Sequence, residues 1–206
     1  MKKKRCLTEE RIDEAFVKKH LGAFTIREDM AALAMRNIHC IKQYAYASNG
    51  CIAARVLHDI DMGDTVYKIL QLGRNRLLHL TPQLMNAMEH HLWEVPMKDY
   101  GPVLVDAPHK LFQQACPYLT GSDSEKSATL ILNLVDRSLV LQGVGVLAGV
   151  AQKEHLDLGA YFLDQLMLIF NAAQALGEIT LRLCVFNRGL LFFGTRSAFI
   201  VTKRMD

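Results

Sequence analysis

The sequence predicts an α+β fold in which short paired strands outnumber the helices. Residues 178–186 alternate between the two faces of a strand, and Asn187-Arg188-Gly189 supplies the turn of a tight hairpin. Apolar side chains recur at helical spacing between Ala160 and Leu176 and predict one amphipathic helix. They are Phe162, Leu166, Ile169, Phe170 and Ala173.

Composition predicts a folded chain of one or two domains. The chain has 206 residues, half of them apolar and 22% charged, which is enough to bury a core. The net charge of +3 is too small to establish a nucleic-acid partner. Residues 1–102 carry 15 basic and 12 acidic side chains, against 9 of each in 103–206, so a basic surface is expected in the first half.

Cysteine usage indicates a reduced, cytoplasmic setting. The five cysteines form no CxxC pair, so neither a disulfide framework nor a zinc knuckle is predicted. The N-terminus begins with basic residues but continues with charge where a signal peptide would be apolar. No window approaches 18 uninterrupted apolar residues, so the sequence predicts a soluble protein with no membrane span.

The first half predicts two helices and then a hairpin. Residues 8–20 have Thr8 as N-cap and Lys18-Lys19-His20 in the last turn, which suits a helix dipole. This helix could be an ordinary solvated helix or a basic arm laid on DNA or a partner. Ser48-Asn49-Gly50 is a strong turn signal. The further elements expected here are a helix at Ile26–Cys40 and strands at Ile41–Ala47 and Cys51–Leu57.

The next segment predicts a loop at Asp59–Asp64, two strands and a capped helix. The strands are expected at Val66–Leu72 and Arg76–Leu80, and the helix runs from Thr81 as N-cap, with Pro82 in its first turn, to Leu92. Proline and glycine in Trp93–Pro102 indicate a linker. The second half is then expected to form strands at 128–134, 138–143, 152–158, 178–186, 189–194 and 197–202, with Asp136-Arg137 as a turn.

Four segments of the second half resemble the C-terminal domain of a bacterial-type DNA sliding clamp, the beta subunit of DNA polymerase III. They are Pro108-His-Lys-Leu-Phe-Gln-Gln-Ala, Leu130-Ile-Leu-Asn-Leu-Val-Asp-Arg-Ser-Leu-Val-Leu, Ala160-Tyr-Phe-Leu-Asp-Gln-Leu and Ser197-Ala-Phe-Ile-Val-Thr-Lys-Arg-Met. The resemblance implies two clamp-like units per chain, the first one shortened. The implied division is a basic helix at 1–22, a shortened unit at 23–95, a linker at 96–107 and a complete unit at 108–206.

The hairpin segment Ala47-Ser-Asn-Gly-Cys-Ile-Ala-Ala resembles Ala-Thr-Asp-Gly-His-Arg-Leu-Ala in the clamp's middle domain. Ala47, Gly50 and Ala54 match, whereas the three residues from Cys51 to Ala53 depart from the pattern. The resemblance implies a cleft that binds short apolar peptides of partner proteins. Carried over by position, its residues are Ser48, Gly50, Cys51, Ile52, Ala53, Val105, Ile200, Thr202 and Met205.

The resemblance implies a non-enzymatic processivity factor or adaptor. It would form a dimeric or trimeric ring on duplex DNA without sequence specificity and tether a DNA polymerase, a clamp loader or another partner. The implied DNA-facing residues are Arg27, Arg36, His109 and Lys110. The helix at 160–176 offers polar and acidic residues but no Lys or Arg on its outer side. The alternative is therefore a protein-interaction or chaperone-like adaptor that binds an amphipathic peptide and not DNA.

No catalytic, cofactor or metal site is predicted. The sequence has no GxSxG, HExxH or phosphate-binding glycine loop, so a small hydrolase is disfavoured. The glycines of 143–149 indicate a strand edge or bulge rather than a nucleotide site. His90 and His91 are adjacent on a helix and point about 100° apart, so they seldom hold one metal ion together.

Overall fold

A computed structural model describes residues 11–25, 33–74, 76–105, 129–135, 138–141, 145–149 and 155–204. Their strands form an eight-stranded antiparallel sheet in the order β4-β1-β2-β3-β12-β11-β10-β5 and a four-stranded sheet in the order β8-β7-β6-β9. The strands of the large sheet are β1 (Ile38–Ile41), β2 (Tyr44–Ser48), β3 (Ile52–Leu57), β4 (Tyr67–Leu70), β5 (Lys98–Leu104), β10 (Thr180–Phe186), β11 (Gly189–Phe193) and β12 (Ser197–Thr202). Those of the small sheet are β6 (Thr129–Val135), β7 (Ser138–Leu141), β8 (Gly145–Gly149) and β9 (Leu156–Phe162).

The helices in the described ranges are few and mostly short. They are α1 (Glu14–Leu21), η1 (Gly22–Phe24), η2 (Leu33–Arg36), α2 (Pro82–Asn86), the π-helical turn η3 (Ala87–His91) and α4 (Leu163–Ala175). The α+β fold class predicted from the sequence is therefore confirmed. None of the helices in the described part of the chain is long and apolar enough to cross a membrane.

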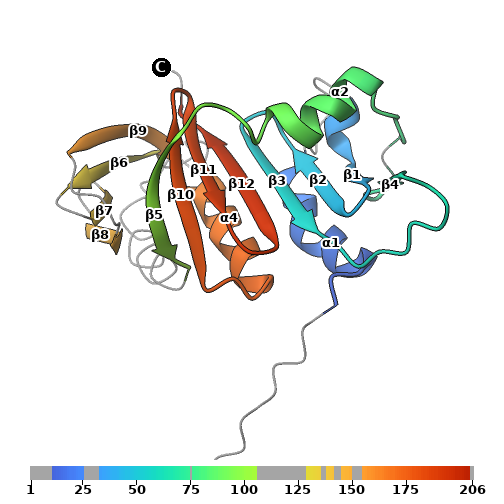
Figure 1. Ribbon diagram of the computed structural model, residues 1–206, viewed down its shortest axis with the longest axis horizontal. Coiled ribbons are helices and arrows are strands. Elements are labelled where there is room, and N and C mark those ends of the chain that lie inside the picture. The colour runs from blue at the N-terminus through green and yellow to red at the C-terminus, as the bar shows by residue number, and fades with distance from the viewer. Residues whose placement is uncertain are drawn as a thin grey trace, which may run out of the picture.

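One face of the large sheet, here called the inner face, packs against α1 and α4 (Figure 1). Val17 of α1 and Ile169 of α4 are fully buried in the same core as Phe199 of β12. Burial of such side chains is the main source of stability in a domain of this size. The inner face is therefore the structural core of the molecule.

The opposite, outer face carries a second apolar cluster and the segment formed by α2 and η3 (Figure 1). Met88 of η3 and the following Trp93 pack against Tyr46 of β2, with the Trp93 and Tyr46 rings 6.5 Å apart. The Trp93 indole N–H donates to the Met88 carbonyl at 2.7 Å. Thr81 caps α2 by accepting from the Leu84 N–H, as predicted from the sequence.

The large sheet runs through both predicted units because β12 pairs with β3. The register places Ala53 opposite Ile200 and Ile52 opposite Val201. Strand β12 also pairs with β11, so it lies in the middle of the sheet. The chain thus joins its two halves by main-chain hydrogen bonds as well as by a connecting segment.

Three of the predicted elements in the first half are wrong in type or extent. Helix α1 begins at Glu14 with Asp13 as its N-cap, rather than at residue 8, and Thr8 lies outside the described residues. Of the helix predicted at 26–40, the described part forms only the short 3-10 helix Leu33–Arg36, and Ile38–Ile41 is strand β1. Residues 76–80 form no strand, because the Leu80 N–H donates to the Tyr67 hydroxyl instead of to a neighbouring strand.

Two predicted boundaries in the second half are also wrong. The helix expected from about residue 160 begins at Leu163, because the residues before it belong to β9. The strand expected at 152–158 corresponds in its described part only to the start of β9. The glycine-containing segment 145–149 is the edge strand β8, with an irregular register against β7, as the glycines indicated. The turn Asp136-Arg137 lies outside the described residues.

The segment expected to be a linker contains strand β5. Lys98–Leu104 pairs with β10 across a register irregularity between Leu183 and Cys184. Gly101 adopts a φ of 90°, which glycine tolerates, and the proline after it lies in a strand at the edge of the sheet. Residues 98–104 are thus an edge strand of the large sheet.

Candidate peptide-binding face

The β2–β3 turn is held by side-chain hydrogen bonds. Oδ1 of Asn49 accepts from the N–H groups of Cys51 and Ile52, both at 2.9 Å, and the Ser48 hydroxyl donates to the Ile52 carbonyl at 2.9 Å. Gly50 has a φ of 92°, a backbone conformation that favours glycine. The hairpin predicted from Ser48-Asn49-Gly50 is confirmed, and its turn presents Cys51 to solvent.

The end of β12 is fastened to this turn. Both the N–H and the hydroxyl of Thr202 donate to the Cys51 carbonyl, at 2.9 and 3.0 Å. Two residues along each strand, Ala53 and Ile200 lie side by side on the outer face, each 7% exposed. The structure therefore brings together most of the predicted cleft residues, although Cys51 and Thr202 are 151 residues apart in the sequence.

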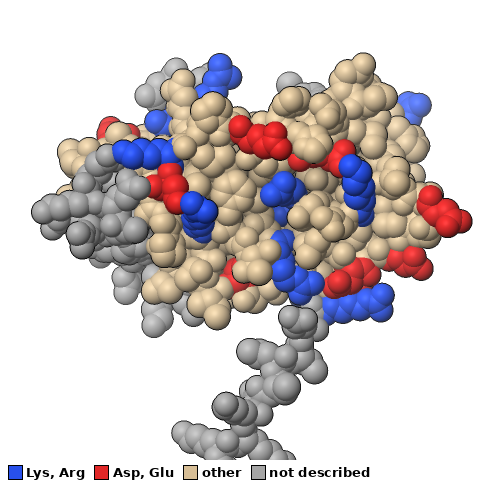
Figure 2. Space-filling view, in the orientation of Figure 1, with Lys and Arg blue, Asp and Glu red and all other residues tan. Residues whose placement is uncertain are grey.

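The outer face continues from Ala53 and Ile200 across β11 and β10 as an apolar surface. Leu191 and Cys184 are buried there, whereas Phe186 and Phe193 remain half-buried. Burial raises the pKa of the Cys184 thiol above its usual value, so the thiol form is favoured. Figure 2 shows that charged side chains on this side are scattered around a largely uncharged surface.

The other predicted cleft residues lie elsewhere. Ile52 is buried in the inner core, because it alternates with Ala53 along β3. Val105 follows β5, donates its N–H to the Ile179 carbonyl and is also part of the inner core. Two strands, β10 and β11, separate β5 from β12, so Val105 is not beside the hairpin. Met205 lies outside the described residues.

Of the predicted DNA-facing residues only Arg36 is described. It ends the 3-10 helix η2 and is half-buried, whereas Arg27, His109 and Lys110 lie outside the described residues.

The two helices on the inner face differ in charge. Helix α4 exposes Asp164, Asn171 and Gln174 and contains no Lys or Arg.

Helix α1 supplies cations on the inner face, which it shares with α4. The sequence analysis did not predict this placement. Lys18 pairs with Glu14 at 2.8 Å, and Lys68 of β4 pairs with the same carboxylate at 3.1 Å. These two lysines lower the pKa of Glu14. Lys19 is exposed on the same helix. The pattern of residues 14–21 predicted a helix, but only the fold shows which sheet face it covers.

A pocket of about 430 Å³ lies on the outer face at the opposite end of β2 from the hairpin turn. Arg55 of β3 has its guanidinium carbon 4.9 Å from the centroids of both the Tyr44 and the Trp93 rings. Burial raises the pKa of Tyr46, on the pocket wall, to about 12. The sequence analysis did not predict this cluster of Arg55 with two aromatic rings, because Trp93 contacts Arg55 only when η3 packs on the outer face.

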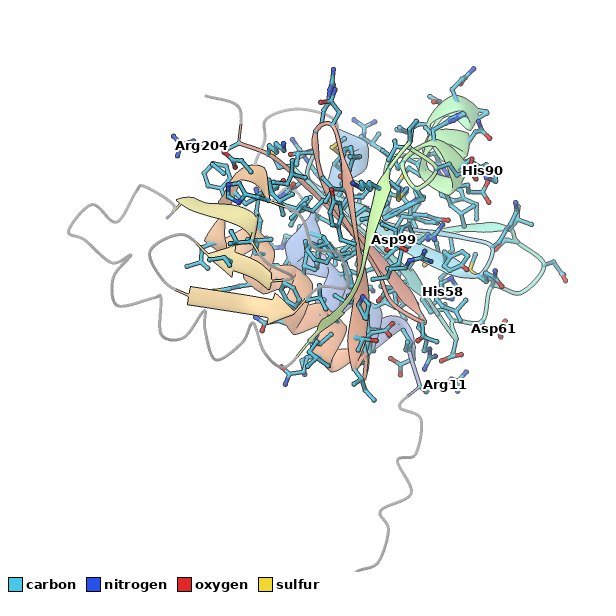
Figure 3. All side chains as sticks on the ribbon, turned by 60° about the vertical axis from the view of Figure 1, so that its left-hand side comes forward. Arg11, His58, Asp61, His90, Asp99 and Arg204 are labelled. Carbon is cyan, nitrogen blue, oxygen red and sulfur yellow. The ribbon has the colours of Figure 1, made fainter. Side chains whose placement is uncertain are left out.

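The two adjacent histidines at the end of η3 contact different partners. Nδ1 of His90 lies 3.6 Å from a carboxylate oxygen of Glu94, and Nε2 of His91 lies 3.2 Å from the amide nitrogen of Asn86. Figure 3 labels His90 on this helical segment and Asp99 on β5. Within the described part of the chain, no three metal-ligating side chains come together.

The fold defined by these sheets and helices is that of a DNA sliding clamp. The chain is similar to the sliding clamp of Pseudomonas aeruginosa, with a TM-score of 0.64 and 11% identity over 94% of this chain. It is similar to a putative DNA polymerase III beta subunit from Eubacterium rectale, with a TM-score of 0.66 and 8% identity over 92% of this chain. The Helicobacter pylori beta clamp bound to a DNA ligase peptide matches with a TM-score of 0.56 and 15% identity over 94% of the chain.

The match is one of structure. No protein-family model matches the sequence, and no curated protein sequence matches it. The chain spans 65%, 62% and 64% of the lengths of the three clamps named above. The resemblance to sliding clamps predicted from the sequence is therefore confirmed for the fold of the bacterial polymerase III beta subunit.

Proposed function

We propose that this protein is a non-enzymatic, cytoplasmic sliding-clamp-like factor that tethers a DNA polymerase or another partner through an apolar peptide-binding face. The observation that carries the proposal is the junction of the β2–β3 turn with the end of β12. In a chain with the clamp fold, it places Ala53, Ile200 and Thr202 together on the outer face. An apolar surface with a few fixed polar groups suits a short apolar peptide.

The proposed ring on DNA rests on the inner face. In such a ring, α1 and α4 would face the duplex, and DNA would be held by diffuse attraction to phosphates rather than by reading bases. The exposed Lys19 then joins the cations proposed from the sequence. Two units per chain, divided as the sequence resemblance implies, would close a ring as a dimer or trimer. A clamp loader and duplex DNA are the further partners of this proposal.

The absolute mass in solution tests ring formation first. The chain has a mass of 23.2 kDa, so light scattering on a sizing column should give two or three times that value at low and moderate salt. The same sample should then be retained on nicked circular DNA and slide off linear DNA of equal length. A monomer at both salt concentrations would contradict the ring.

A charge reversal tests which face meets DNA. Lys19→Glu should weaken retention on circular DNA and reduce its salt dependence, because one phosphate contact is lost. Arg188→Glu, in the exposed turn between β10 and β11, is the matched control and should retain DNA as the wild type does. Equal loss in both variants would mean that only net charge matters and would contradict an inner DNA surface.

A second candidate function is a protein-interaction or chaperone-like adaptor that binds an amphipathic peptide without DNA. The observation favouring it is α4, which exposes Asp164, Asn171 and Gln174 where a DNA-lining helix would carry cations. A monomer that binds apolar peptides at the outer face and has no affinity for duplex at low salt would support this candidate. Peptide binding should then be unaffected by Lys19→Glu.

A further inference from the structure

The pocket at the far end of β2 has a lining unlike that of the peptide-binding face. Its walls come from the β1–β2 turn, from β2 and β3, and from the helical turn η3. The lining residues are Lys42, Gln43, Tyr44, Tyr46, Arg55, Glu89 and His90. Two aromatic rings, two permanent cations and one carboxylate therefore meet in a space of about 430 Å³. That volume lies within the range of small-ligand sites.

Arg55 is the cation of this pocket that has no acidic partner among the residues that the structure describes. Its guanidinium stacks on Tyr44 and Trp93, which fixes the group by cation–π contact rather than by an ion pair. Lys42, by contrast, pairs with Glu89 at 2.8 Å. The lining therefore carries one excess positive charge.

A guanidinium held by stacking still has its N–H edge available for hydrogen bonds. That edge forms a planar fork that matches the two oxygens of a carboxylate. Because the stacking rings hold the fork in place, little side-chain entropy remains to be lost when an anion binds. Tyr44 is half-buried beside it and offers an aromatic surface to an apolar neighbour of the anion.

We propose that this pocket binds the carboxylate of an acidic residue in a partner peptide, with Arg55 as the anchoring cation and Tyr44 packing against an adjacent apolar side chain. One excess cation matches one carboxylate. A phosphate would bring nearly two negative charges against the Glu89 carboxylate on the rim. The site lies on the same outer face, at the Gln43 end of β2, and shares no lining residue with the proposed peptide-binding cleft, so the two can be tested separately.

Trp93 is the only tryptophan in the chain and stacks on Arg55, so its fluorescence reports directly on the site. The probes are blocked dipeptides, N-acetyl-Glu-Leu-amide and the isosteric N-acetyl-Gln-Leu-amide, titrated into the full-length protein at low salt. The glutamate peptide should change the emission saturably. The glutamine peptide should bind about tenfold more weakly or not at all, because it cannot form the charge-assisted pair.

Three variants separate recognition from folding. Arg55→Met keeps much of the side-chain volume and should weaken the glutamate peptide about tenfold. Glu89→Gln removes the competing carboxylate and should strengthen binding about threefold. Arg204→Met is the matched control, because Arg204 stacks on Phe162 away from the pocket, and it should bind as the wild type does.

The opposite signs of the Arg55 and Glu89 effects make the test decisive, since a merely structural role for either residue would not strengthen binding. Equal affinity for the glutamate and glutamine peptides would overturn the proposal. Weaker binding by Glu89→Gln would overturn it too. Saturable binding of inorganic phosphate or of a deoxynucleoside monophosphate, with no response to the glutamate peptide, would assign the pocket to phosphate instead.

Discussion

The inner face of the large sheet packs against α1 and α4, whereas α2 and η3 lie on the outer face. Phe199 and Phe193 illustrate the difference, since they stand on neighbouring strands of the same sheet. Phe199 points inward, is fully buried and stacks on Phe24 with ring centroids 5.9 Å apart. Phe193 points outward and stays half-buried.

This difference shows that alternation along a strand assigns a side chain to a face but does not decide its role. What decides the role is the element that covers the face. Inner-face side chains meet helices of the same chain and contribute to stability. Outer-face side chains such as Phe186 keep apolar area available for a partner. Removing side chains from each face should therefore affect different properties.

The largest expected effect is on the inner face. Phe199→Ala should lower the free energy of unfolding by about 3–5 kcal/mol, because it leaves a cavity under α1 and α4. Phe193→Ala, the matched outer-face variant, should cost about 1–2 kcal/mol because its ring is already partly in solvent. Urea denaturation followed by circular dichroism measures both. Similar losses would remove the distinction between the two faces.

The next effect concerns two carboxylates in different surroundings. Glu178 is 8% exposed and accepts hydrogen bonds from the N–H groups of Thr195 and Arg196, both at 2.8 Å, and from the Ser197 hydroxyl at 2.9 Å. Glu178→Gln should cost about 1.5–3 kcal/mol, because an amide NH₂ would face these donors.

Glu89→Gln is the control for Glu178, because the Lys42–Glu89 pair lies on the outer face with the lysine 63% exposed. Its expected cost is about 0–1 kcal/mol. Both variants can be compared with the wild type by the same urea titration. A larger loss in Glu89→Gln than in Glu178→Gln would show that the outer-face ion pair holds η3 in place.

The smallest effect is a pH dependence at the end of β3. Burial lowers the pKa of His58 below its ordinary value of 6.5, and its Nδ1 accepts from the Ile60 N–H. The unfolded chain therefore takes up this proton at a higher pH than the folded chain. Stability should be at its full value above about pH 6.5 and fall as the pH decreases below it.

His58→Asn tests that prediction because asparagine keeps an acceptor for the Ile60 N–H but does not titrate. The difference in urea midpoint between pH 7.5 and pH 5.5 should be smaller in this variant than in the wild type. His90→Asn, on an exposed side chain, is the control and should leave the difference closer to that of the wild type. An unchanged difference in His58→Asn would assign the pH dependence to other groups.

The elements predicted correctly from the sequence are those fixed by local chemistry. Asn49 and Gly50 make the β2–β3 turn through contacts within four residues, and Thr81 caps α2 in the same way. The strands after α4 were predicted nearly to the residue, since their turn residues and alternation agree. Local signals of this kind need no knowledge of the rest of the fold.

The elements predicted wrongly lack such signals. Strand β1 is buried at all four positions, so it shows no alternation and cannot be distinguished from a buried helix by periodicity. Strand β5 contains Gly101 and Pro102, which indicate a linker unless the partner strand and its irregular register are known. The partner of β5 is β10, which is distant in sequence, whereas β1 pairs with the adjacent β2 and with β4.

The candidate site divides in the same way. The resemblance to sliding clamps predicted that Ala53, Ile200 and Thr202 act together, and the structure does bring them together. It did not predict that Val105 would be buried in the inner core. The stacking of Arg55 on Trp93 depends on where η3 packs, so no spacing of residues in the sequence predicts it.

The central position of β12 has a consequence for how the chain folds. Cys51 and Thr202, which are hydrogen-bonded in the folded state, are 151 residues apart in sequence. During synthesis the free edge of β3 must wait for β12 to emerge, and an exposed strand edge is a template for pairing with other chains. Closing a loop of this length also slows folding. We therefore expect the first half to need protection from intermolecular strand pairing on the ribosome until β12 has been translated.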